Sequence, residues 1–469
     1  MTTIDTVSMR RTEGPGSPGL ASDSPGELRP VLSMKDLVLM IVGTVIGSGI
    51  FLVPGVVLRA VGNSFSMAIW VWVAGGVLSL LGALTYGELS AMKPKTGGLY
   101  VYIRDGFGPF PAFLFGWTMF FVISSGSIAT LAAAFSNYLS EFVPLSPLAA
   151  KAVSVLMIVV ITAVNIRGTR QSADLLNLAT AIKVAAILLM SAALLWKGGH
   201  SFSSASWLPS FKTTGALGFG LAMVSVLWAY EGWQYVTYIA GETVNPQRVY
   251  PRAFLLGSSL LVAIYVSANL GYAAALGVAG VAASTRVAAS ALAVVASHGA
   301  SRMVAAVILV SIFSAANSIM LNSPRVYHAM AKDGLFFHSL AKVNRRFGTP
   351  ALAITVAGIW SALLAVSGTF EQLLTYVVFI GWIFYALAAA SIFVYRRREP
   401  QAVRPYHVPG YPFTPIVFVA AAMAVVINTI VGQPGRAAIG LAVVFLGAPA
   451  YAFWRRTASI AHGPVTHEN

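Results

Sequence analysis

The chain has 469 residues, of which 57% are hydrophobic and only 10% carry a charge, and its mean hydropathy is +0.77. Apolar stretches of about 18 residues or more recur along almost its whole length, which excludes a soluble multidomain protein and predicts an all-α, polytopic membrane protein. These stretches are continuous and do not alternate with polar residues, which argues against an outer-membrane barrel. The chain has no cysteine, so disulfide bonds and thiol catalysis are excluded.

The chain divides into two tails and a long apolar region. Residues 1–32 are rich in Gly, Pro, Ser and Thr, and we expect them to form a disordered cytoplasmic tail. A second cytoplasmic tail is expected at 457–469. Between the tails we expect twelve membrane spans, at about 34–61, 66–92, 108–141, 148–166, 172–196, 217–243, 251–277, 302–331, 350–367, 371–396, 412–432 and 435–456.

The basic residues, which give the chain a net charge of +15, are distributed unevenly between the loops. With the N-terminus inside, the tails and the loops on its side carry 22 Lys and Arg, the opposite loops carry 7, and Lys183 lies within a span. This bias predicts that both termini are cytoplasmic and that the protein is a multi-pass protein of the plasma (inner) membrane. The basic residues then determine topology and meet the lipid bilayer, and no nucleic-acid partner is expected.

The first span contains three glycines within seven positions, Gly43, Gly47 and Gly49. Glycine disfavours an uninterrupted helix, and a helix that breaks within the membrane usually lines a cavity. A half-helix ending near Ile46 would offer carbonyl groups to an ammonium, and one starting near Gly49 would offer N–H groups to a carboxylate. Such a site suits a zwitterion such as an α-amino acid. The alternative is a small-residue face that packs against a neighbouring helix.

Lys183 lies about eleven residues into the fifth span, roughly 17 Å deep at 1.5 Å per residue. A charge at that depth is costly and implies a partner. Lys183 could hold a broken helix through its carbonyl groups, could take up and release a proton, or could be a purely structural buried lysine.

The sixth span has a similar interruption at residues 228–233. The two interrupted spans are five helices apart, and an odd number of helices per repeat gives the second copy an inverted topology. We therefore expect a transport core at 33–396, built from inverted repeats at about 33–196 and 217–396, with two further helices at 397–456.

Two residues of the sixth-span interruption are candidates for the site. Glu231 could contact a substrate amine or hydroxyl, could carry a coupled proton, or could pair with protein donors. Trp228 could lie over the substrate as a gate or could serve only in packing. Glu88 and Arg325 lie toward the cytoplasmic ends of their spans, where ion pairing is expected for Glu88 and a structural or gating role for Arg325.

No motif for catalysis, nucleotide binding or metal binding occurs. There is no H-E-x-x-H, no P-loop and no dinucleotide fingerprint after a strand, and the seven histidines fall in loops, tails or span ends. We therefore expect neither an enzyme nor an ATP-driven pump, and no cofactor or metal. A channel is disfavoured because no filter-like repeat or carboxylate ring occurs.

The chain resembles the amino acid–polyamine–organocation superfamily from about residue 33 to 456, and within it the L-amino-acid transporter branch. The residues that carry the resemblance are 43–51 with Pro54, 86–89, 94–100, 107–109, Lys183, 228–233, 241–246, 251–253, 322–325 and 333–334.

The resemblance implies a fold of five plus five inverted helices and two more, and sodium-independent transport of L-amino acids by alternating access. It also implies that Lys183 replaces the sodium ion that sodium-coupled relatives hold between spans one and eight, and that Trp228 is a gate. Ser314 is the hydroxyl available to Lys183, because Ala315 stands where the family often has one. By position, the substrate would be bound by Ile46, Gly47, Ser48, Gly49, Ile50, Trp228, Ala229, Tyr230 and Glu231.

The sequence thus predicts an amino acid carrier that works by exchange or with protons, with neutral amino acids favoured. A cationic amino acid or polyamine antiporter that uses Glu231 as counter-ion is the alternative, and a channel or sensor is a further one. Eukaryotic members of the branch bind a heavy-chain glycoprotein through a cysteine, so the absence of cysteine predicts no disulfide-linked heavy chain. The sequence sets no oligomeric state.

Overall fold

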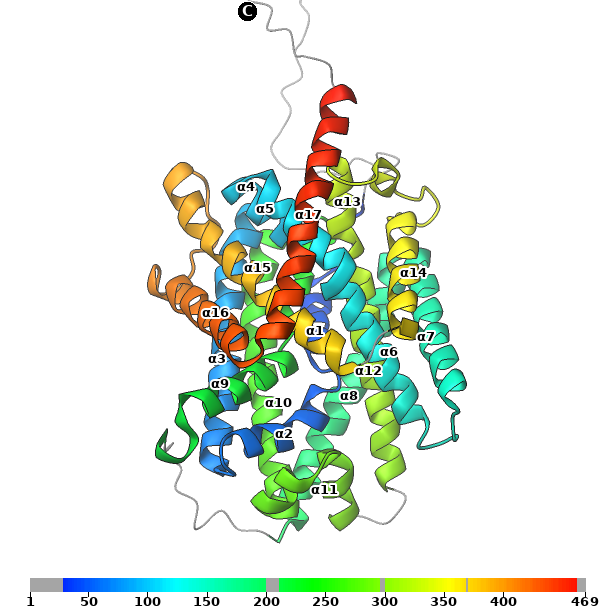
Figure 1. The fold of residues 1–469 in the computed structure, drawn as a ribbon, viewed down its shortest axis with the longest axis vertical. Coiled ribbons are helices and arrows are strands. Elements are labelled where there is room, and N and C mark those ends of the chain that lie inside the picture. Colours follow the sequence, from blue (N-terminus) through cyan, green and yellow to red (C-terminus); the bar gives the residue numbers. More distant parts are fainter. Residues whose placement is uncertain (1–27, 200–210, 296–299, 368–369, 462–469) are drawn as a thin grey trace, which may run out of the picture.

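The computed structural model describes residues 28–199, 211–295, 300–367 and 370–461 and is built almost entirely from helices (Figure 1). Most of the expected tails, at 1–27 and 462–469, lies outside the described residues.

The first half of the chain forms α1 (Met34–Val45), α2 (Gly49–Ala60), α3 (Phe65–Met92), α4 (Leu99–Phe107), α5 (Pro109–Thr118), η1 (Met119–Ile123), α6 (Ser124–Leu139), α7 (Pro147–Arg167), α8 (Thr169–Lys197), α9 (Phe211–Ala229) and η2 (Trp233–Glu242). Of these, η1 is a π-helical turn and η2 is a 3-10 segment. The second half forms α10 (Pro246–Ala283), α11 (Val287–Val295), α12 (Ala300–Asn322), α13 (Pro324–Lys332), the 3-10 turn η3 (His338–Ala341), α14 (Ala351–Ser367), α15 (Phe370–Arg398), α16 (Phe413–Gly432) and α17 (Pro434–Ala461).

Within the described ranges, nine helices are long and apolar enough to cross a membrane, or ten if the bent pair α1 and α2 forms one span. The two members of that pair are bent by 49° at a break of three residues. The expected all-helical membrane protein and the break in its first span are therefore confirmed. A count of twelve spans requires that α14, which is shorter, and the interrupted α9–η2 segment also cross.

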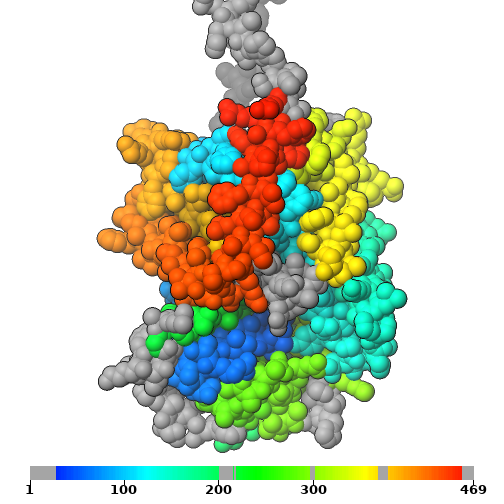
Figure 2. Space-filling model, in the orientation of Figure 1, coloured from blue at the N-terminus to red at the C-terminus, as the bar shows by residue number. Residues whose placement is uncertain are grey.

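The short helix α1 lies in the centre of the bundle, where it packs against α8, α10 and α12 (Figure 1). Eight of its twelve residues are buried. The last two helices lie at the periphery, where α16 packs on α3 and α15, and α17 packs on α5 and α15. Figure 2 shows α17 running across one face of the molecule, beside α16. The break in the first span is therefore enclosed by other helices.

Two ion pairs fix one end of the bundle, and the second of them is buried on both sides. The Glu88 carboxylate at the end of α3 receives two hydrogen bonds from Arg396, at 3.0 and 2.7 Å, so it is ion-paired. Arg325 of α13 donates to Glu242 at 2.8 and 3.1 Å, and Thr169 donates to the same carboxylate at 2.5 Å. The backbone N–H groups of residues 31 and 32 donate to the Glu242 carbonyl, which fastens the start of the described chain to the end of η2.

Candidate functional site

The glycines at the break in the first span have different neighbours. A Cβ at Gly43 would collide with Thr180 of α8, and one at Gly49 would lie 2.8 Å from the Cα of Ala229 in α9. A Cβ at Gly47 would meet its nearest atoms only at 3.7 Å. Gly43 and Gly49 therefore allow close contact with neighbouring helices, and the helix also breaks between them. Both interpretations of the three glycines, helix packing and helix interruption, apply.

The second interruption lies directly against the first. Helix α9 ends at Ala229, and η2 begins at Trp233 after Gly232, whose φ of 125° suits glycine. The Tyr265 hydroxyl of α10 lies 3.2 Å from the carbonyl of Val45 and 2.8 Å from that of Ala229. A single hydroxyl therefore reaches the last residue of both broken helices, where carbonyl groups lack helical partners.

Lys183 is fully buried and reaches the broken end of α1 from α8. Its Nζ donates to the carbonyl of Gly43 at 2.5 Å, to that of Ile46 at 2.8 Å, and to Ser314 Oγ of α12 at 3.2 Å. These three acceptors match the three N–H donors of an ammonium group. Ser311, one turn away on α12, donates to the carbonyls of residues 46 and 47 at 2.8 and 3.0 Å.

A cavity of about 40 Å³ lies at the junction of the two interruptions. Its walls come from the end of α1, the start of α2, α6, the α9–η2 interruption and α12, and consist of Thr44, Val45, Gly47, Ser48, Gly49, Ser127, Leu131, Trp228, Glu231, Gly232, Tyr235, Ala315 and Ile319. We call this space the central cavity. Its volume corresponds to one or two water molecules, so an amino acid would fit only in a conformation in which the cavity is wider.

Five of the residues expected to bind substrate line this cavity: Gly47, Ser48, Gly49, Trp228 and Glu231. The other four do not. Ile46 and Ile50 are fully buried, and the Ile46 carbonyl already accepts bonds from Lys183 and Ser311.

Ala229 and Tyr230, the two other expected residues outside the cavity walls, are buried behind it. Ala229 packs against Gly49, and its carbonyl accepts the Tyr265 hydroxyl. Tyr230 packs against the rings of Tyr265 and Trp72, with ring centroids 4.9 and 6.1 Å apart.

The cavity walls on α6 and α12 were not predicted from the sequence. Ser127 and Leu131 on α6, and Ala315 and Ile319 on α12, are each spaced four residues apart, so each pair forms one face of its helix. The four-residue spacing is the signal in the sequence that could have indicated these walls, but many residue pairs in a helical membrane protein have the same spacing. Only the packing of the helices shows which pair meets the cavity.

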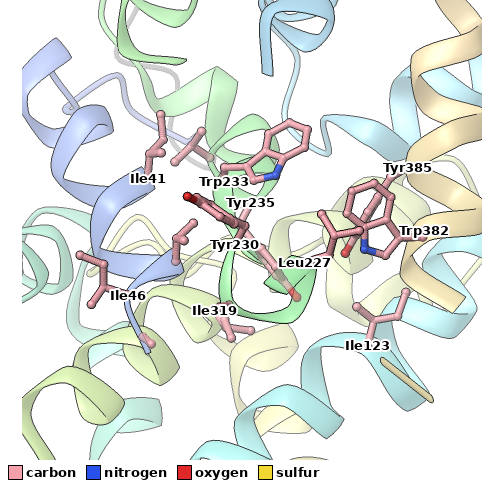
Figure 3. Packing of buried hydrophobic residues seen from close by; sticks show 14 of the residues in the cluster. Ile41, Ile46, Ile123, Leu227, Tyr230, Trp233, Tyr235, Ile319, Trp382 and Tyr385 are labelled. Carbon is pink, nitrogen blue, oxygen red and sulfur yellow. The ribbon is translucent and has the colours of Figure 1, made fainter. Parts of the chain in front are cut away.

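Glu231 is held by two neighbours at the cavity wall. Its Oε1 accepts the Tyr385 hydroxyl of α15 at 2.6 Å and the Gln234 amide at 2.5 Å. Figure 3 shows aromatic residues around this turn, with Tyr230, Trp233 and Tyr235 on the α9–η2 segment and Tyr385 across from them. One carboxylate oxygen is thus engaged by the protein, and the carboxylate can still accept further donors.

Among the described residues, no group of three or more His, Asp or Glu side chains is arranged to hold a metal ion. The polar groups at the cavity are instead backbone groups, hydroxyls and one carboxylate. They can bind a small polar solute reversibly by hydrogen bonds and charge, and the interrupted helices allow the cavity to change shape. A helical membrane protein with such a cavity between two interrupted helices has the architecture of a solute carrier.

Comparisons with known proteins give the family. The family model described as amino acid permease matches residues 32–448. The serine/threonine exchanger SteT of Bacillus subtilis is 30% identical over 429 residues, covering 90% of this chain and 96% of its own. The human (Homo sapiens) b(0,+)-type amino acid transporter 1 is 31% identical over 418 residues, covering 87% and 84%. The human large neutral amino acids transporter small subunit 2 is 29% identical over 457 residues, covering 94% and 83%.

The chain therefore belongs to the amino acid permease family, in the L-amino-acid transporter branch of the amino acid–polyamine–organocation superfamily. The resemblance seen in its motifs is confirmed, and the protein is a transporter, not an enzyme. Because the chain contains no cysteine, it has no disulfide link to a heavy chain.

Proposed function

We propose that the protein exchanges neutral L-amino acids across the plasma (inner) membrane without sodium, with the substrate bound at the central cavity. The observation that carries this proposal is the contact of the Lys183 ammonium with the carbonyls of Gly43 and Ile46 and with Ser314. A fixed cation at this point stabilises the freed carbonyl groups of the broken helix, so a bound metal ion is not needed to do so.

The substrate's ionic groups would meet backbone groups at the cavity. The N–H groups at the start of α2, near Ser48 and Gly49, carry the positive end of a helix dipole and suit the α-carboxylate. The α-ammonium would face the cavity oxygens of Thr44 and Ser127, with the Glu231 carboxylate nearby. Trp228 would cover the substrate from the side of α9.

The proposed fold has twelve spans, and five-helix inverted repeats at 33–196 and 217–396 would move relative to each other for alternating access. Two observations support it: the interruptions lie against each other at Gly49 and Ala229, and the basic residues are strongly biased to one side. Both termini would be cytoplasmic, and α16 and α17 would stand outside the repeats.

Exchange is favoured over proton coupling because one relative is named a serine/threonine exchanger. Neutral substrates are favoured because another relative is named for large neutral amino acids. The test is uptake into sodium-free proteoliposomes preloaded with an amino acid mixture, with and without a pH gradient. Uptake that needs internal amino acid and ignores the pH gradient supports exchange. Uptake driven by the pH gradient without internal substrate would establish proton symport and contradict the proposal, and Glu231 and Lys183 would become the first residues to examine.

A cationic amino acid or polyamine is the second candidate substrate, favoured by the carboxylate of Glu231 in the cavity wall. Glu231→Gln keeps an oxygen that can accept the Tyr385 hydroxyl but removes the charge. If Glu231 is the counter-ion, this variant loses lysine and polyamine uptake and retains alanine uptake. Asp174→Asn, at an exposed acid on α8, is the matched control. Lysine uptake that survives in Glu231→Gln would rule out the counter-ion role.

A further inference from the structure

Helix α1 is fastened to α8 at its start as well as at its break. Asp36, in the first turn of α1, is only 2% exposed. Its carboxylate accepts two hydrogen bonds from the Arg170 guanidinium of α8, at 2.9 and 3.2 Å, and one from the Asn177 amide of the same helix at 2.6 Å. The start of α1 thus carries a buried charge that is paired with α8 and lies away from the central cavity.

The fastenings at the two ends of α1 match in their spacing. Asp36 and Gly43 are seven residues apart on α1, about 10 Å at 1.5 Å per residue, and Asn177 and Lys183 are six apart on α8, about 9 Å. Two straight helices that run in the same direction can therefore make both contacts together. The backbones also approach closely between them, because a Cβ at Gly43 would collide with the side chain of Thr180. Sliding of α1 along α8 would break both fastenings.

The hydrogen bonds between α1 and α12 are of a different kind. The Thr44 hydroxyl contacts the Ser318 hydroxyl, and the Ser311 hydroxyl donates to the carbonyls of residues 46 and 47. These bonds join neutral groups, whereas each of the five named bonds between α1 and α8 has a charged partner. Charge-assisted hydrogen bonds are roughly twice as strong as neutral ones, and a hydroxyl can exchange its partner for water when two helices separate. The contact with α12 is therefore the easier one to open.

Helix α8 also makes hydrogen bonds to α12 and α13. Asn317 of α12 donates to the carbonyl and the hydroxyl of Ser172, at 3.3 and 3.2 Å. The bond from Lys183 to α12 is the longest of its three, at 3.2 Å, and Arg325 of α13 donates to the Thr169 hydroxyl at 2.8 Å. Only the last two of these bonds involve a charge, against five between α8 and α1. By this comparison α1 and α8 are the more strongly joined pair.

We propose that α1 and α8 move as one rigid unit during transport, with Asp36 and Arg170 as a second pair of positioning residues. The unit separates from α12 when the central cavity opens toward the side where α1 begins. The inference rests on the proposed function, in which the repeat that contains α1 and α8 moves against the repeat that contains α12. A clamp at Lys183 alone would leave the start of α1 free to swing away from α8, and the pairing of Asp36 prevents this.

Two adjacent residues of α1 face the two helices and provide a matched test. Gly43 faces Thr180 of α8, with 3.4 Å between the two Cβ positions, and the side chain of Thr44 contacts Ser318 of α12. The Cβ atoms of a disulfide lie about 3.5–4.5 Å apart, and the chain has no cysteine of its own. The two double variants are Gly43→Cys with Thr180→Cys, and Thr44→Cys with Ser318→Cys. Exchange is measured in proteoliposomes after oxidation and again after reduction.

The two cross-links should have opposite effects. We expect the oxidised α1–α8 variant to exchange within about twofold of its reduced form, because the bond lies within the rigid unit. The oxidised α1–α12 variant should lose exchange about tenfold or more and recover it on reduction. Comparing two states of one variant cancels the effect of the substitutions themselves. Loss of exchange on oxidation of the α1–α8 pair would refute the rigid unit, and undiminished exchange in the oxidised α1–α12 pair would refute its separation from α12.

Spin-label distances provide a second measurement that does not depend on a cross-linked variant being active. Cysteine pairs for labelling are introduced at the exposed positions Lys35 on α1, Gln171 on α8 and Lys332 at the end of α13. The 35–171 distance should be narrowly distributed and the same with and without saturating alanine, whereas the 35–332 distance should vary. Asp36→Ala should broaden the 35–171 distribution, and Asp36→Glu should restore part of its sharpness. A 35–171 distance that varies as much as the 35–332 distance would overturn the rigid unit.

These measurements distinguish failure of the inference from failure of the proposed function. A wild-type chain that exchanges amino acids, together with loss of exchange in the oxidised α1–α8 variant, would refute the rigid unit alone. A wild-type chain that exchanges no amino acid would refute the proposed function. The 35–171 distance and its response to Asp36→Ala would then still decide whether α1 and α8 form one unit.

Discussion

Replacing Lys183 with alanine tests whether the buried ammonium holds the broken first span in its working geometry. The substitution removes hydrogen bonds to the carbonyls of Gly43 and Ile46 and to Ser314 Oγ. We expect the variant to insert into the membrane and to exchange amino acids far more slowly than the wild type.

The magnitude follows from the two carbonyl contacts. A hydrogen bond to a charged group contributes about 1.5–3 kcal/mol, so the two together contribute about 3–6 kcal/mol. The Ile46 carbonyl keeps its bond from Ser311, which favours the lower end of this range. A loss of about 3 kcal/mol shifts the equilibrium between the described conformation and others by a factor of about 150, since 1.4 kcal/mol is tenfold. We therefore expect exchange to fall about 100-fold.

Stability should respond less than transport. Burying the Lys183 ammonium away from water costs several kcal/mol of stability, and the alanine variant does not carry this cost. Its absence offsets part of the stability that is lost with the hydrogen bonds. The assay is exchange in proteoliposomes at matched protein density, together with the melting temperature in detergent. Lys183→Met separates charge from volume, because it keeps a long side chain and should be as inactive as the alanine variant.

The control is Lys197→Ala, at the exposed C-terminal end of the same helix, α8. It should exchange at the wild-type rate. Wild-type exchange in Lys183→Ala would show that the broken helix keeps its geometry without the ammonium. Full activity in Lys183→Met with loss in Lys183→Ala would assign the effect to side-chain volume and would also refute the electrostatic explanation.

Three further predictions concern the interruptions and the buried ion pair. Gly49→Ala places a methyl group 2.8 Å from the α9 backbone and should reduce exchange at least tenfold. In Gly47→Ala the methyl group lies 3.7 Å from its nearest neighbours, so this variant should fold normally and keep its melting temperature. Tyr265→Phe removes the hydroxyl that reaches both broken helices and should slow exchange about fivefold, for a loss of about 1 kcal/mol; an unchanged rate would show that this hydroxyl is dispensable. Arg325→Ala leaves the buried carboxylate of Glu242 without its cation and should cost about 3–5 kcal/mol of stability, seen as a lower melting temperature that replacing both residues with apolar ones restores.

The first break could be predicted from the sequence because its signals are local. Three closely spaced glycines and a lysine deep in a span need no knowledge of distant contacts, and α1 does end at Val45 where carbonyls near Ile46 were expected. The contact of Lys183 with those carbonyls was one of three possibilities left open. Whether that contact forms depends on the rotation of α8 against α1, and apolar composition does not encode that rotation.

The residues behind the cavity show what local patterns leave undetermined. Ile50, Ala229 and Tyr230 belong to the same short motifs as residues that line the cavity, yet they pack away from it. Where a helix is interrupted, its residues no longer repeat every 3.6 positions, so sequence order does not give the direction of each side chain. Ser127 on α6 was not predicted, because it lies in a regular helix far from any motif.

The contact between the two interruptions also bears on how the central cavity could open. Gly49 and Ala229 are close enough that α2 and α9 cannot slide past each other at this point without separating. Trp228, next to Ala229, forms part of the wall of the central cavity. Any movement that separates α9 from α2 at this contact must therefore also displace Trp228 and change the shape of the central cavity.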